Sequence, residues 1–120
     1  MTNNRTLEER DRLNPDVALI RKTSSTNAER GWQYIKLLIT KSGMKNQELE
    51  AWLNIKYHKL EEMGILEFSD TRPIAGALFY LGSIITGDGV SKRTIRSILT
   101  PLSQNTLDRK VKDIRSTLDV

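Results

Sequence analysis

Basic and amide side chains gather toward the C-terminus of this 120-residue chain. Between Ser91 and Arg115 there are seven basic residues against two acidic ones, whereas the rest of the chain holds twelve basic and thirteen acidic residues. The net charge of +4 at pH 7 therefore belongs to the C-terminal quarter. Clustered cations neutralise phosphates, and neighbouring amides can contact base edges, which together is the chemistry of nucleic-acid binding. The alternative is a solvated helix surface whose cations only complement the helix dipole.

The candidate base-contacting residues lie on the last predicted helix, which Ser103 caps. Its apolar residues recur at steps of four, three and four, namely Leu107, Val111, Ile114 and Leu118. At about 100° per residue, the opposite side of the helix carries Asn105, Arg109, Lys112 and Ser116. Recognition helices usually touch bases with their N-terminal residues, which here are Gln104, Asn105, Thr106, Asp108 and Arg109. Asn and Gln can pair bidentately with adenine, and Arg with guanine.

A short helix precedes this one, capped by Ser91 and ended by Thr100-Pro101. It directs Ile95, Ile98 and Leu99 inward. Its polar residues are candidates for contacts with the DNA backbone, which position a protein without specifying sequence; they are Ser91, Lys92, Arg93 and Arg96. Two short helices joined by a tight turn predict a helix-turn-helix over residues 91–118.

The element that must position this pair is an uncharged run over residues 74–85. Its length and its small residues Ala75, Gly76 and Ala77 favour a buried helix, with Pro73 at the first helical position. A helix that is apolar all round must be surrounded by other helices. Twelve residues span about 18 Å, which is too short to cross a membrane.

The remaining segments also predict helices. Thr26 to Glu29 form a capping box before a helix that stops at Ser42-Gly43, and a second amphipathic helix runs from Asn46 to Gly64. Residues 1–24 predict an N-terminal arm and linker, with one short helix over 6–13 and another starting at Asn14-Pro15, whose apolar residues 17–20 favour docking on the body. Residues 25–120 predict one domain, and the fold class is all-α.

Several kinds of chemistry are missing from the sequence. There is no cysteine and His58 is the only histidine, so we expect no metal site, no cofactor and no enzyme activity. The adjacent carboxylates Glu61 and Glu62 point about 100° apart on a helix and do not form an acid/base pair. The N-terminus lacks the apolar run of a secretion signal, and we expect a cytoplasmic protein.

The order of elements resembles one cyclin-type repeat of transcription factor IIB and its archaeal counterpart. Residues 49–57 are similar to the second helix of that repeat, residues 72–81 to its small-residue central helix, and residues 102–114 to its recognition helix. The resemblance implies a five-helix cyclin-like domain that binds promoter DNA beside the TATA element, with TATA-binding protein and RNA polymerase as partners. The chain departs from the family in having room for one repeat and no cysteine-ligated zinc ribbon. Asp108, Arg96 and Thr100-Pro101 also replace residues usual in the family.

We therefore expect a transcription regulator that docks its last helix in the major groove of double-stranded DNA. One alternative is a protein-interaction module in which the cyclin-like body holds a partner and the basic end is incidental. Another is a different helix-turn-helix repressor that forms a homodimer through its arm, residues 6–20.

Overall fold

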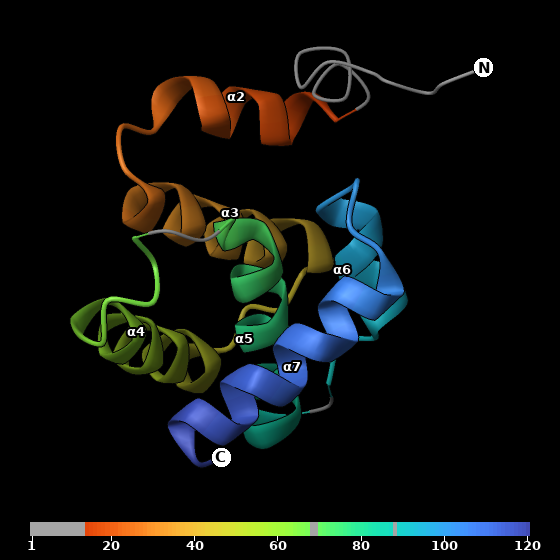
Figure 1. The fold of residues 1–120 in the computed structure, drawn as a ribbon. Coiled ribbons are helices and arrows are strands. Elements are labelled where there is room, and N and C mark those ends of the chain that lie inside the picture. Colours follow the sequence, from red (N-terminus) through yellow and green to blue (C-terminus); the bar gives the residue numbers. More distant parts are fainter. Residues whose placement is uncertain (1–13, 68–69, 88) are drawn as a thin grey trace.

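The computed structural model describes residues 14–67, 70–87 and 89–120, and all regular structure in these ranges is helical. Six helices pack into one compact body (Figure 1), and their bounds are α2 Pro15–Thr23, α3 Asn27–Ser42, α4 Gln47–Glu62, α5 Thr71–Thr86, α6 Lys92–Ile98 and α7 Gln104–Leu118. The prediction of an all-α chain is confirmed for these residues. The short helix predicted over residues 6–13 lies outside the described residues.

Polar side chains cap the five helices α2, α3, α4, α6 and α7, four of them at predicted caps and one, Asn46, at the predicted start of its helix. The side chains of Asn14, Thr26 and Asn46 accept hydrogen bonds from backbone N–H groups in the first turns of α2, α3 and α4. Ser91 and Ser103 do the same for α6 and α7. Each cap satisfies a donor that the helix itself leaves unpaired. The helix starts are therefore determined by local chemistry.

The central helix α5 begins earlier than predicted. The Asp70 carboxylate accepts a hydrogen bond of 3.1 Å from the Arg72 N–H, so the helix starts at Thr71. Pro73 is therefore the third helical residue, and its placement at the first position was wrong. The first turn tolerates proline because its N–H groups have no partner within the helix.

Helix α5 is enclosed as its composition predicted, since it contacts α3, α4, α6 and α7. Eleven of its residues are buried. Gly82 allows a close approach to α4, because a β-carbon at this position would lie 2.7 Å from Cε3 of Trp52. None of the described helices has the length and apolar composition that a membrane crossing requires. The buried helix is thus the core of the domain.

Helix α2 lies alongside α3 at the top of Figure 1. Its Val17 is completely buried, as expected for a segment that docks on the body. After α4 the chain folds back, and Leu66 enters the core with 1% of its surface exposed. These two segments complete the packing around α3 and α4.

Candidate nucleic-acid interface

Helix α7 presents the polar side that its sequence pattern predicted. Leu107, Val111 and Ile114 are buried in the core, and α7 packs along α5. On the opposite side Asn105, Arg109, Lys112 and Ser116 are exposed. The hydrophobic stripe therefore fixes which side chains face solvent.

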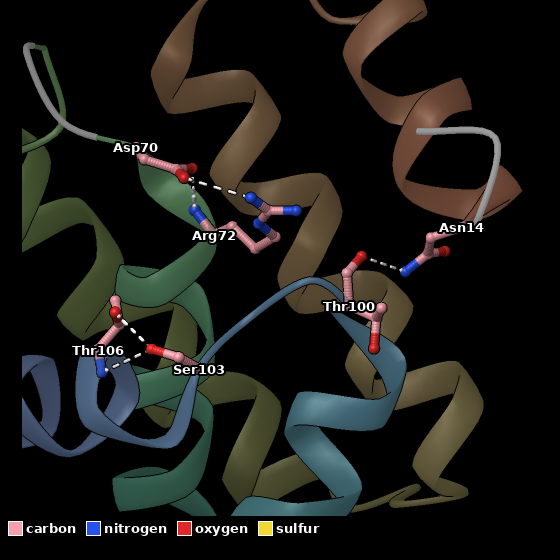
Figure 2. A network of polar contacts seen from close by, with 6 residues as sticks. All are labelled: Asn14, Asp70, Arg72, Thr100, Ser103 and Thr106. Atoms are coloured by element: carbon pink, nitrogen blue, oxygen red, sulfur yellow. Dashed lines mark hydrogen bonds and ion pairs between the residues drawn. The ribbon is translucent and has the colours of Figure 1, made fainter. Parts of the chain in front are cut away.

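Ser103 fixes the start of this helix. Its Oγ accepts a hydrogen bond of 3.1 Å from the Thr106 N–H and donates one of 2.7 Å to Thr106 Oγ1 (Figure 2). Gln104 and Asn105, the first two helical residues, are exposed beside the cap. These amides stand on an ordered turn, which limits the freedom they would lose on binding.

The preceding helix α6 is anchored by Ile95, which has no exposed surface, and by Leu99 directly after it. Ser91 caps it by accepting a hydrogen bond of 3.1 Å from the Thr94 N–H. Arg93 is exposed on its outer side. Helices α6 and α7 contact each other and both contact α5, so the buried helix is the platform for the pair.

Side chains hold the connection between the two helices, residues 99–103. Arg96 Nε donates a hydrogen bond of 3.0 Å to the Leu102 carbonyl, and Thr100 Oγ1 donates one of 2.9 Å to the Arg96 carbonyl. A hollow of about 500 Å³ opens here. It is lined by Arg93, Arg96, Ser97, Thr100, Pro101, Leu102 and Ser103. Two guanidinium groups and several hydroxyls thus border one surface depression.

An ion pair joins α6 to α7. Lys92 Nζ lies 2.8 Å from Asp108 Oδ1 and 5.0 Å from the centre of the Tyr80 ring on α5. The Lys92 ammonium group therefore contacts α7 through the ion pair and α5 through a cation–π contact. Because the two charges of the pair offset each other, the positive character of the surface comes from the other cations.

The predicted site residues divide into two groups. Those exposed to solvent are Ser91, Arg93, Gln104, Asn105, Thr106, Arg109 and Lys112. Those half-buried and engaged with the protein are Lys92, Arg96 and Asp108. Among the described residues, no carboxylate pairs with Arg93, Arg109 or Lys112. The exposed cations are thus available to a ligand.

Two residues of this region were not predicted. The amide of Asn14, far away in the sequence, donates hydrogen bonds to the carbonyls of Ile98 (3.0 Å) and Thr100 (2.8 Å). Figure 2 shows this side chain reaching the turn from the start of α2. The sequence marked Asn14 only as a helix cap, and it marked Tyr80, the ring that Lys92 contacts, only as part of the uncharged run over residues 74–85. Contacts between distant segments leave no local pattern in a sequence.

The exposed groups are donors of the kind that bind phosphates and base edges. The described residues contain no group of three or more potential metal ligands. Comparison of the chain with models of protein families, with curated proteins and with solved structures gives no match.

Proposed function

We propose that this protein is a DNA-binding transcription regulator that places α7 in the major groove of duplex DNA. The observation that carries the proposal is the exposed row of Asn105, Arg109 and Lys112 on a capped helix. No described carboxylate pairs with either of the two cations. In this arrangement α6 and α7 form a helix-turn-helix, whose second helix reads bases with its N-terminal residues.

The exposed side chains of α6 and α7 have two different roles in this proposal. Gln104, Asn105 and Arg109 contact base edges, since amides and guanidinium groups match adenine and guanine in the major groove. Lys112 and Arg93 contact phosphates on either side of the groove. The hollow bordered by Arg93 and Arg96 fits a backbone phosphate, because both side chains are cationic and Arg96 is already held against the turn.

The order of the helices supports a relation to the cyclin-type repeat of transcription factor IIB. Helices α3 and α4 precede the buried α5, and the pair α6 and α7 follows it. On this basis TATA-binding protein and RNA polymerase are proposed as further partners. Asp108, which departs from the family pattern, is a positioning residue here because its carboxylate binds Lys92.

A mobility-shift titration with random-sequence duplex DNA at 50 and 200 mM salt tests the proposal. Each phosphate contact should contribute about −0.9 to the slope of log affinity against log salt concentration, because binding releases condensed counterions. With three to five cationic contacts we expect a slope of roughly −3 to −5. A flat response with weak binding would contradict DNA binding and favour the alternative of a protein-interaction module.

The Arg109→Ala variant tests the placement of α7. If Arg109 reads a base, the variant should lose about 1–3 kcal/mol of binding free energy on a preferred site. The loss of binding free energy on random-sequence DNA should be smaller. Lys36→Ala removes an exposed cation from α3 and is the matched control, expected to bind as the wild type does. Equal binding by the wild type and Arg109→Ala would remove α7 from the interface.

A further inference from the structure

A second site of opposite charge lies between the start of α3 and the end of α4. It is a pocket of about 290 Å³. Helix α3 and its cap contribute Thr26, Ala28, Glu29 and Trp32, and α4 contributes Asn54, Tyr57, His58 and Glu61. We call it the aromatic-acidic pocket. In Figure 1 the ends of α3 and α4 that form it lie at the left, and α6 with the start of α7 lies at the right.

Two aromatic rings form one wall of the pocket. The ring centres of Trp32 and Tyr57 are 5.4 Å apart, and the planes are tilted by 44°. The Tyr57 hydroxyl donates a hydrogen bond to the Ala28 carbonyl, which fixes the ring against α3. Burial, and then the charge of Glu61, raises the pKa of the Tyr57 phenol far above its usual range, so the hydroxyl keeps its proton. The wall is therefore uncharged and held in place.

Two carboxylates give the pocket its charge. Glu29 accepts hydrogen bonds from the Ser25 hydroxyl (2.7 Å) and the Ser25 N–H (3.2 Å), which lower the pKa of its carboxyl group and keep it ionised. Glu61 Oε1 lies 3.4 Å from His58 Nδ1. Among the described residues, no lysine or arginine lines the pocket. The lining is thus anionic on a chain whose net charge is +4.

The chemistry of the lining selects the ligand. Phosphates are repelled by the two carboxylates, so this is not a second DNA surface. A guanidinium group meets both features, because it stacks on aromatic faces and donates two parallel hydrogen bonds to a carboxylate. An ammonium group lacks the planar fork that such a site favours. We propose that the aromatic-acidic pocket binds an arginine side chain from a basic segment of a partner protein. The proposal does not depend on DNA binding by α7.

A nuclear magnetic resonance titration of the ¹⁵N-labelled full chain tests this proposal. The probe is an acetylated and amidated Gly-Arg-Gly peptide, and the matched peptide contains citrulline, which has the same shape without the charge. The chain has two tryptophans, so the indole N–H of Trp52, which packs against Gly82 outside the pocket, serves as an internal control for Trp32. We expect a saturable shift of the Trp32 signal with a Kd on the order of millimolar, as suits a single side chain.

Glu61→Gln should weaken binding of the arginine peptide about tenfold, because charge-assisted pairs are the strong hydrogen bonds. Glu61 caps no helix, so this variant should fold as the wild type does, and its spectrum reports that directly. Glu62→Gln makes the same change one residue away, outside the pocket, and should leave the Kd unchanged. Equal shifts with the citrulline peptide, equal shifts of Trp52, or an unchanged Kd in Glu61→Gln would each overturn the proposal.

Discussion

At the scale of single residues, one carboxylate of the proposed DNA surface pairs with a lysine of the neighbouring helix. Asp108 lies on α7, one residue before the exposed Arg109, and its partner Lys92 comes from α6. The Lys92 side chain is 33% exposed and the Asp108 side chain is 41% exposed. Solvent therefore screens the ion pair, and its contribution to stability is modest. The same negative charge lies close to where phosphates would bind.

Asp108→Asn should therefore separate stability from affinity. We expect the free energy of unfolding to fall by roughly 0.2–1 kcal/mol, the usual range for exposed pairs. Affinity for random duplex DNA should rise about two- to threefold, because a charge that repels phosphates is removed and Lys92 is released. Urea unfolding and mobility-shift titration at low salt measure the two effects.

The control for this change is Asp16→Asn, which removes a carboxylate from another ion pair, 3.6 Å from Lys41 Nζ. It should cost similar stability without altering DNA affinity. If Asp108→Asn weakened DNA binding, the Asp108 carboxylate would be a base-contacting group, as in acceptance of a hydrogen bond from cytosine.

At the scale of helices, a single glycine on α5 determines how closely the α6–α7 pair can approach. A β-carbon at Gly76 would lie 3.1 Å from Ile95, 3.4 Å from Leu107 and 3.5 Å from Leu102. These side chains come from α6, from α7 and from the connection between them. All three parts of the proposed helix-turn-helix therefore meet α5 at one point.

Gly76→Val should displace the pair from α5. Overpacking a well-filled core costs about 1–3 kcal/mol, which urea unfolding would detect. At temperatures where the variant stays folded, its affinity for duplex DNA should also fall, because the angle between α6 and α7 changes. Ala51→Val, on the exposed side of α4, controls for the lower helix propensity of valine. Wild-type stability in Gly76→Val would show that α6 and α7 can shift without cost.

The helices could be predicted from sequence because their determinants are local. Ser91 and Ser103 cap through hydrogen bonds within three residues, and the stripe of α7 follows from helical periodicity. The start of α5 was predicted wrongly because Pro73 is compatible with any position of the first turn. The Lys92–Asp108 pair and the aromatic-acidic pocket were not predicted, since both depend on how helices lie beside one another.

At the scale of the whole molecule, the beginning of the described chain holds the turn between α6 and α7, where the proposed DNA surface lies. Asn14 is 92% buried, and its side chain uses all of its hydrogen-bonding groups in this role. Its amide nitrogen donates to the carbonyls of Ile98 and Thr100, and its oxygen accepts from the Val17 N–H. One side chain therefore both starts α2 and restrains the turn between α6 and α7.

Asn14→Asp distinguishes these two roles. Aspartate caps helices as well as asparagine does, so a residue that acted only as a cap would tolerate the change. Because a carboxylate cannot donate, two carbonyls lose their partner and face a negative charge. We expect a loss of roughly 1–3 kcal/mol in the free energy of unfolding at pH 7, as for other buried groups left unpaired. Thr26→Asp, at a cap whose side chain hydrogen-bonds only within α3 among the described residues, should be nearly neutral. If urea unfolding found both variants as stable as the wild type, the contact between α2 and the turn would not contribute to the fold.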